Sequence, residues 1–316
     1  MTIDRRVFMG SGLVLASLSA VGCSLDLPPR QDAPEIDPNN TSAAMLRQIE
    51  GKFGGTLGAE FVDVTSGQSI GINRDMRFGH CSSFKLSLAA KILQRDATGE
   101  DSADRQVRWS ESDLMFVSPF TTRKLSDGAT LRELAEATQK YSDNAAANIL
   151  LREIGGPGAL TAFWRALGDD VSRLDRNEPS LNNVPPIEIR DTTSPASMAR
   201  TVTKLIYGDA LPEEQRALLR QWMTDTPTGL DRVRKGLPGN WQAGDKTGTG
   251  LAPGTGGIYI DIGFAKPPEC GPITYAVYYR PPGTDNTYDK SHEEPLARAG
   301  EVLSEFAKNL DKAHDP

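Results

Sequence analysis

Apolar residues occupy every side of one predicted helix, which begins near Ser82 and continues to Leu93. Its apolar positions are Phe84, Leu86, Leu88, Ala89, Ala90, Ile92 and Leu93. A helix that is apolar all round is buried, whereas a surface helix is apolar along one stripe. We therefore expect this helix to lie in the middle of the fold.

Strand patterns flank a long helical stretch. Alternating and continuous apolar runs predict a hairpin of strands at 56–64 and 69–73, and three later strands at 241–247, 257–264 and 273–279. Between these groups, strand signals nearly vanish from 82 to about 207. Helical spacing is found at 43–53, 131–138, 145–154, 160–167, 195–207, 217–224 and 293–310.

This order of elements predicts an α/β fold with an antiparallel sheet. The sheet is formed by N-terminal and C-terminal segments, is flanked by helices, and carries an inserted all-helical lobe. We expect a single domain over 42–312, with an α/β lobe of 42–75 plus 225–312 and a helical lobe of 76–224. A cleft between two such lobes is the default place for a binding site.

The first 23 residues have the form of a signal peptide. Arg5 and Arg6 precede an apolar run from Leu13 to Val21, which is too short to span a bilayer permanently. The arginine pair, with Phe8, resembles a twin-arginine export signal. We expect the mature protein to leave a bacterial cytoplasm for the periplasm.

Two processing routes are open at the end of this segment. The stretch Ala20-Val-Gly-Cys23 resembles a bacterial lipobox, which predicts a lipid anchor on Cys23. The alternative is ordinary cleavage near Ala20 or Gly22. In either case, the Pro-, Asp- and Asn-rich residues 24–41 read as a flexible tether.

Composition argues against several other functions. The net charge is −7, and no Lys/Arg cluster is interleaved with aromatic residues, so nucleic acid is not an expected partner. The 3 histidines and 3 cysteines lack metal-ligand spacing, which argues against a zinc site and a Ser-His-Asp triad. We expect no metal, no cofactor and a monomeric chain.

The start of the buried helix carries candidate chemistry. Ser82 and Lys85 are three residues apart, so their side chains lie on neighbouring faces of the first turn. An amine can therefore reach a hydroxyl at a helix N-terminus, where free N–H groups stabilise a developing oxyanion. Taken alone, the pair is more often a capping serine and a solvated lysine.

Three further stretches strengthen this signal. Ser142-Asp-Asn144 stands between two helical patterns, so its side chains can project from a turn. Lys246-Thr-Gly248 is predicted to end a strand, where Gly248 and Gly250 permit close approach of a ligand. Glu178 and Asn182 lie in a loop rich in proline and asparagine. Each stretch alone has an ordinary structural explanation.

Together, in this order and spacing, these motifs form the pattern of penicillin-interacting serine enzymes and class A β-lactamases. The chain resembles a class A serine β-lactamase, within the penicillin-binding-protein and β-lactamase superfamily, along nearly its whole mature length. Arg176 and Asp191 stand where that family places the ion pair that closes its Ω-shaped loop. The resemblance implies hydrolysis of a β-lactam, a small-molecule substrate.

The resemblance also implies roles in acylation. Ser82 would be the nucleophile that forms an acyl-enzyme. Its N–H and that of Thr249 would form the oxyanion hole. Either Lys85, or Glu178 acting through a water, would take the serine proton, and this choice stays open. Ser142 would pass a proton to the departing ring nitrogen.

Other residues would bind substrate or resolve the ester. Lys246, Thr247 and Thr249 would bind the substrate carboxylate, next to Gly248 and with help from Arg232; a surface charge is the ordinary alternative for Arg232. Asn144 belongs to the same substrate-binding set. Glu178 would hold a water against the ester, and Asn182 would steady that water.

Two other functions use the same scaffold. A D-alanyl-D-alanine carboxypeptidase shares the serine, lysine and Lys-Thr-Gly elements, but it stalls on β-lactams. A β-lactam sensor domain keeps its acyl group and would need a retained membrane helix. Glu178 argues against both, because it provides a route to deacylation.

Two positions depart from the family pattern. Val117 stands where an aromatic residue often lines the cleft, with Phe116 beside it. Because the residue after Thr249 is Gly250, the disulfide that some carbapenem-hydrolysing relatives form cannot occur at Cys81, which we expect to be a buried thiol.

Overall fold

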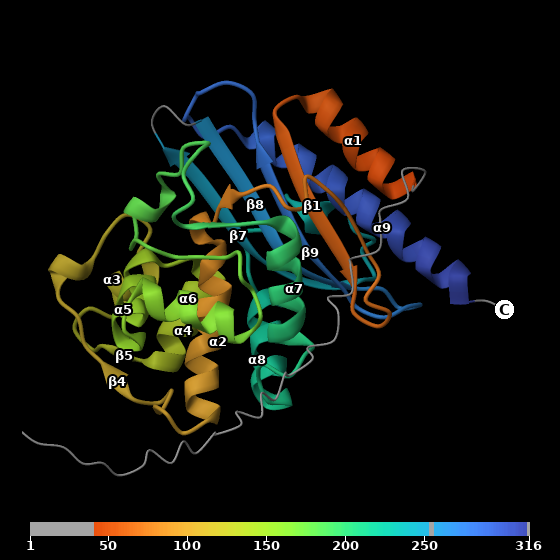
Figure 1. Ribbon diagram of the computed structural model, residues 1–316. Helices are drawn as coiled ribbons and strands as arrows, with labels where there is room; N and C mark the ends of the chain where they lie inside the picture. Colours follow the sequence, from red (N-terminus) through yellow and green to blue (C-terminus); the bar gives the residue numbers. More distant parts are fainter. Residues whose placement is uncertain (1–40, 253–255, 315–316) are drawn as a thin grey trace, which may run out of the picture. The chain divides into compact units, whose positions relative to one another are not determined.

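Five antiparallel strands form the main sheet of the computed structural model (Figure 1). They are β1 (Thr56–Asp63), β2 (Ser69–Ile72), β7 (Gln242–Ala252), β8 (Gly256–Lys266) and β9 (Ile273–Arg280), in the order β2-β1-β9-β8-β7. Strand β1 pairs with β9 from Thr56 opposite Arg280 to Asp63 opposite Ile273. N-terminal and C-terminal segments thus build one sheet, and the predicted fold class is confirmed.

The structure describes residues 41–252 and 256–314. These residues belong to one unit, Ile36–Pro316. The predicted signal peptide and all but the last residue of the predicted tether lie outside the described residues. No helix in the described ranges is long and apolar enough to cross a bilayer.

Helices cover both faces of the sheet, so its strands are buried on both sides. The face toward α1 (Thr41–Phe53) and α9 (Glu294–His314) holds one apolar core, and the face toward α2 (Phe84–Ala97) and α7 (Pro195–Ile206) holds the other. Strand β8 serves both, because Tyr259 points to the first core and Ile258 and Ile260 to the second.

Helices dominate the middle of the chain. They are α3 (Pro119–Arg123), α4 (Leu131–Tyr141), α5 (Asn144–Ile154), α6 (Pro157–Ala166) and α8 (Glu213–Thr224). Short 3-10 turns are η1 (Cys81–Ser83), η2 (Glu111–Asp113), η3 (Ser180–Asn182), η4 (Val233–Gly236) and η5 (Lys290–Glu293). The division into lobes at 75/76 and 224/225 remains a prediction, since one apolar core spans both sides of it.

The predicted buried helix is confirmed as α2. Phe84, Leu86, Leu88, Ala89, Ala90 and Leu93 are fully buried, and Ile92 is nearly so. Its buried residues lie in one cluster with Leu134 of α4 and Leu150 of α5, and with Ile260 of the sheet. The helix that carries the candidate nucleophile is therefore held from all sides.

Two features of the strands differ from the sequence-based expectation. Lys246-Thr-Gly248 does not end its strand: β7 continues to Ala252, because residues up to Ala252 pair with the start of β8. Two-residue ladders join β3 (Phe78–Gly79) to β6 (Thr192–Thr193) and β4 (Gln106–Val107) to β5 (Ala129–Thr130). These ladders are too short to leave an apolar periodicity.

A buried histidine directly precedes η1. The His80 ring is fully buried and stacks on Trp164, with ring centroids 4.8 Å apart and planes 10° from parallel. Burial lowers the pKa of His80 from 6.5 to about 3. The folded protein therefore holds this imidazole neutral at pH values where the unfolded chain protonates it.

We predict that His80 destabilises the fold in acid. Below pH 6.5 the unfolded chain binds a proton that the folded imidazole rejects until about pH 3, so the free energy of unfolding falls with pH through this window. Between pH 7 and pH 5, the free energy of unfolding of the parent should fall by about 2 kcal/mol more than that of His80→Met. Urea unfolding of both proteins at these two pH values measures the difference; equal losses would contradict the prediction.

Candidate active site

A cleft of about 760 Å³ gathers the predicted site residues from five parts of the chain. Its lining includes Ser82, Ser142, Asn144, Glu178, Asn182, Arg232, Thr247, Gly248 and Thr249. Lys85 and Lys246 lie behind this lining with no exposed surface. All catalytic and substrate-binding residues expected from the sequence are thus brought together.

Ser82 lies in η1, the 3-10 turn that leads into α2. The turn packs closely on β7: a Cβ at Gly248 would lie 3.2 Å from Ser82 N and 3.1 Å from His80 O. A Cβ at Gly250 would lie 2.6 Å from Cys81 Sγ. Glycine at both positions lets the strand edge approach the serine. Cys81 is a buried thiol, as expected, and burial raises its pKa to about 12.

Lys85 connects the groups of the catalytic centre. Its Nζ lies 2.9 Å from Ser82 Oγ and 3.0 Å from Glu178 Oε1. It also donates to Ser142 O at 3.0 Å and to Asn144 Oδ1. A proton can therefore move between the serine hydroxyl and the carboxylate through a single amine.

Glu178 is held at both its side chain and its backbone. Asn182 Nδ2 lies 2.7 Å from Glu178 Oε2. Asn148 of α5 brackets the backbone, accepting from Glu178 N at 3.0 Å and donating to Glu178 O at 2.9 Å. Asn148 was not anticipated; its spacing of four residues from Asn144, on the same helix face, is the signal that could have indicated it.

Ser142 lies in the turn between two helices. It is the C-cap of α4, in a left-handed conformation with φ of 56°, and Asp143 caps α5 by accepting from Ala146 N at 2.8 Å. The turn aims Ser142 Oγ between two amines: Lys85 Nζ at 3.3 Å and Lys246 Nζ at 3.2 Å. Burial and the neighbouring Lys85 lower the pKa of Lys246 well below its usual value.

The other end of the cleft is lined by hydroxyls and one guanidinium. Arg232 is only 4% exposed, so the surface-charge alternative for it is wrong. It donates to Thr249 Oγ1 at 2.7 Å and pairs with Glu293 at 2.9 Å. Thr228 Oγ1 lies 2.8 Å from Thr247 Oγ1. Thr228 and Glu293 were not anticipated, since neither belongs to a local motif.

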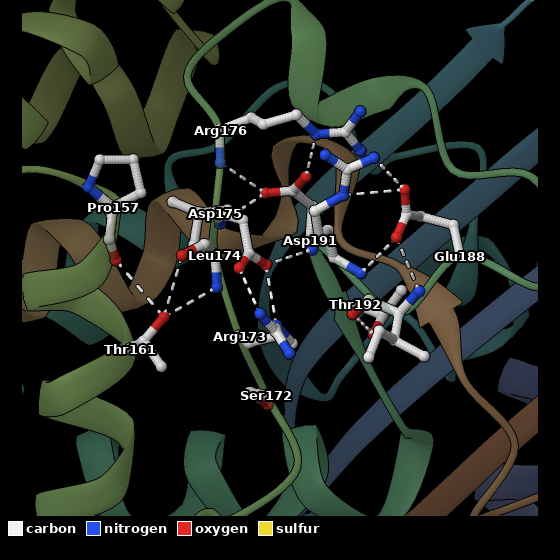
Figure 2. A network of polar contacts seen from close by, with 12 residues as sticks. Pro157, Thr161, Ser172, Arg173, Leu174, Asp175, Arg176, Glu188, Asp191 and Thr192 are labelled. Atoms are coloured by element: carbon white, nitrogen blue, oxygen red, sulfur yellow. Dashed lines mark hydrogen bonds and ion pairs between the residues drawn. The ribbon is translucent and has the colours of Figure 1, made fainter.

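Asp191 closes the loop that carries Glu178, and Figure 2 shows its contacts with Asp175 and Arg176. Its buried carboxylate accepts from Asp175 N at 2.7 Å, from Arg176 N at 2.9 Å and from Arg176 Nε at 2.5 Å. Asp175 Oδ2 in turn accepts from Asp191 N at 3.1 Å. The two ends of the loop are therefore joined by reciprocal hydrogen bonds as well as by the expected ion pair.

Apolar side chains stand at the mouth of the cleft. Phe116 and Val117 line it and are 89% and 41% exposed. Val117 has φ of 58°, and its carbonyl accepts from Asn144 N at 2.8 Å. Within residues 41–252 and 256–314 no group of three or more His, Cys, Asp or Glu residues could hold a metal ion.

The site defines a serine enzyme of acyl transfer. It has a hydroxyl at a helix start with a lysine beside it, a second serine between two lysines, and a carboxylate in contact with the first lysine. Such an arrangement provides an activated nucleophile, together with a separate carboxylate that is available for the steps after acylation.

Known proteins identify the family. The family model described as the beta-lactamase enzyme family matches residues 41–306, so the chain belongs to this family. The carbapenem-hydrolyzing beta-lactamase KPC of Klebsiella oxytoca is 40% identical over 84% of this chain and 89% of its own. Beta-lactamase CTX-M-8 of Citrobacter amalonaticus is 36% identical over 86% and 91%.

Solved structures agree. The reconstructed class A beta-lactamase of the last common ancestor of Gram-negative bacteria superposes with a TM-score of 0.79 at 41% identity, covering 84% of this chain and 99% of that one. A beta lactamase from Burkholderia vietnamiensis gives 0.80 at 39%, covering 87% and 99%. The chain is an enzyme that hydrolyses β-lactams by the serine mechanism of class A.

We predict that Asp191→Asn weakens the fold and slows turnover. The asparagine amide would face Arg176 Nε with a second donor, in a position with no exposed surface. The free energy of unfolding should fall by about 1–3 kcal/mol. Denaturant unfolding and penicillin hydrolysis measure both effects.

Glu188→Gln is the matched control in the same loop. Glu188 pairs with Arg190, whose side chain is 53% exposed and screened by solvent, so Glu188→Gln should change stability far less than Asp191→Asn does. If Glu188→Gln lowers the free energy of unfolding as much as Asp191→Asn does, the effect comes from any change in this loop and not from its buried closure by Asp191.

Proposed function

We propose that Ser82 opens the β-lactam and that Glu178 directs the water that releases the product. The observation that carries this proposal is the contact of Lys85 Nζ with Ser82 Oγ at 2.9 Å and with Glu178 Oε1 at 3.0 Å. Nucleophile, amine and carboxylate form one continuous chain in a buried site.

In acylation, Lys85 passes its proton to Glu178 and then accepts the proton of Ser82. Ser82 Oγ bonds to the lactam carbonyl carbon, and the carbonyl oxygen becomes negatively charged. The N–H groups of Ser82 and Thr249 stabilise that charge; the close packing of Gly248 on Ser82 N supports this pairing. Removing one such donor typically costs about 10²–10³ in rate.

The ring nitrogen then needs a proton. Ser142 Oγ donates it and is reprotonated by Lys246, which lies 3.2 Å away. The lowered pKa of Lys246 favours this donation, because its buried ammonium holds its proton weakly. Asn144, bonded to Lys85, keeps the amine aligned during these transfers.

The substrate carboxylate binds at the other end of the cleft. Thr247 and Thr249 donate hydroxyl hydrogen bonds, and Lys246 and Arg232 supply positive charge. Arg232 donates to Thr249 Oγ1, which directs the Thr249 hydroxyl hydrogen away from the guanidinium and toward a ligand. Glycine at 248 and 250 allows the substrate to lie against the strand edge.

Deacylation is the step that separates hydrolysis from trapping. Before deacylation, the proton that Lys85 took from Ser82 passes through Ser142 to Lys246, and Glu178 returns its proton to Lys85. Glu178 then takes a proton from a water as that water attacks the ester carbon. Lys85 protonates the departing Ser82 Oγ, and Glu178 passes the proton of the water back to Lys85. Asn182 Nδ2 donates to Glu178 Oε2 at 2.7 Å and orients the carboxylate, and the Asn182 amide steadies the water. Positioned general bases of this kind contribute about 10²–10⁴ in rate.

Glu178→Ala should therefore trap the acyl-enzyme. In this variant Lys85 can give its proton to the ring nitrogen through Ser142, 3.3 Å away, and take the proton of Ser82, so acylation still proceeds. The water, in contrast, has lost its base. After mixing with benzylpenicillin, intact-protein mass spectrometry should find one covalently bound substrate, and turnover should fall by about 10²–10⁴.

Ser82→Ala is the control and should bind no substrate covalently. Turnover by Glu178→Ala at the parental rate, with no adduct, would overturn the assignment of deacylation to Glu178.

We also propose that the chain is exported to the periplasm and acts as a monomer of two lobes. The basic start, the short apolar run and the lipobox-like Ala20-Val-Gly-Cys23 support export. Lipidation at Cys23 and cleavage near Ala20 or Gly22 remain the two processing routes, and both lie outside the described residues.

The mature N-terminus distinguishes these routes. On the lipobox route the protein begins at Cys23 with a lipid attached and partitions into the detergent phase, and Cys23→Ser abolishes both. Mass spectrometry of protein from a bacterial host checks this. A lipid-free N-terminus in the parent would establish ordinary cleavage instead.

A further inference from the structure

Two buried carboxyl groups lie behind the strand that lines the cleft. Asp245 of β7 and Asp261 of β8 have no exposed surface. Asp245 pairs with Gly263, and Asp261 with Thr247, so the two acids are diagonal neighbours on one face of the sheet. Side chains in this relation are close enough to interact. None of the catalytic steps above uses them.

The cations around this pair do not balance it. Arg234 forms an ion pair with Asp245 and also donates to Thr224 O at 3.2 Å. Arg232 is already paired with Glu293, and Lys246 Nζ bonds to Ser142 and to Thr247 O at 2.6 Å.

Tyr275, the remaining polar neighbour of the two acids, supplies no positive charge. The Tyr275 hydroxyl, from β9, faces Asp261 and lies over Gly263, where a Cβ would be 2.8 Å from it. Asp261 Oδ1, Asp245 Oδ2 and the Tyr275 hydroxyl form no hydrogen bond within residues 41–252 and 256–314.

The two adjacent buried carboxyl groups have only Arg234 as a paired cation, and this environment favours retention of a proton by the pair. A proton between them supplies the donor that the unpaired oxygens lack. In agreement, burial raises the pKa of Asp245 to about 6, and burial together with the neighbouring Asp245 raises the pKa of Asp261 well above its usual value. Such a pair titrates as a unit.

The same pair anchors the turn that follows Arg232. Asp261 Oδ2 accepts from Val233 N at 3.0 Å, and Asp245 holds the Arg234 side chain. A Cβ at Gly229 would lie 2.2 Å from Asp245 Oδ2, so the chain before Arg232 also rests on this carboxyl. Arg232 is thus positioned from both sides by contacts with the two acids.

We propose that Asp245 and Asp261 share one proton and, through the turn at Gly229–Arg234, position Arg232 for the substrate carboxylate. They are positioning residues, since neither lines the cleft. The inference rests on the proposed role of Arg232. When the pH rises and the shared proton leaves, two buried anions repel each other, the turn loosens, and binding of the substrate carboxylate weakens.

The test compares variants of the full-length enzyme with benzylpenicillin. Asp261→Asn keeps the shape and cannot ionise, so kcat/KM should stay within about 3-fold of the parent at pH 7 and decline less from about pH 7 to about pH 9. Asp261→Ala removes the acceptor for Val233 N and should lower kcat/KM about 10-fold, mainly through KM.

A double-mutant cycle identifies the route of action. In an Arg232→Gln background, Asp261→Ala should change kcat/KM by less than about 2-fold, because its effect passes through Arg232. The inference is overturned if Asp261→Ala lowers kcat/KM by the same factor in the parent and in Arg232→Gln. It is also overturned if kcat/KM declines toward high pH as much in Asp261→Asn as in the parent.

If Arg232→Gln alone leaves kcat/KM at the parental value, the proposed role of Arg232 fails first. Should Asp261→Ala not fold, the comparison of the parent with Asp261→Asn decides. Infrared spectroscopy at pH 7 should then show a protonated-carboxyl band in the parent that is lost in Asp261→Asn, and its absence from the parent refutes the shared proton.

Discussion

The buried ion pair of Lys85 and Glu178 is the contact on which the rest of the active site depends. Its side chains are 0% and 1% exposed, and desolvation of each ion costs several kcal/mol unless the partner is well placed. That placement comes from two independent parts of the fold. Helix α2 fixes the amine from the core, and the closed loop with Asn148 fixes the carboxylate from the side.

A second constraint is the close packing of β7 on η1. The proposed oxyanion hole needs two N–H groups at one point, those of Ser82 and Thr249, which are more than 150 residues apart in the sequence. Only a strand edge without side-chain bulk can come near enough, as the contacts of Gly248 and Gly250 demonstrate. The sheet pairing of β7 with β8 along its full length then holds this edge straight, which explains why the Lys-Thr-Gly segment lies inside the strand.

Motifs predicted the residues of the site better than they predicted its support. Ser82, Lys85, Ser142, Glu178 and Lys246 each stand in a local pattern, and the structure brings all five together. The burial of Arg232 depends on Glu293, which is 61 residues away, and no local pattern encodes such a pairing. The same holds for Thr228, whose partner Thr247 is provided by the tertiary fold, whereas Asn148 has one local signal, its spacing of four residues from Asn144. Long periodic elements were predictable, whereas two-residue ladders were not.

Residues with a strained backbone conformation are concentrated around the cleft. Of the five non-glycine residues with positive φ in the described ranges, Cys81, Val117 and Ser142 surround the cleft and Asp191 closes its loop. Valine is β-branched and strongly disfavours this conformation, at a cost of about 1–3 kcal/mol. Such strain persists only where neighbouring contacts over-determine the backbone.

Asn144 supplies those contacts for Val117, and it links them to the buried Lys85. Its backbone N–H donates to Val117 O. In its side chain, Nδ2 donates to Phe116 O at 2.9 Å and Oδ1 accepts from Lys85. The cleft wall, the strained residue and the buried amine are therefore all contacted by one residue, Asn144. Relaxation at the wall would withdraw an acceptor from Lys85, so the strained backbone and the buried charge hold each other in place.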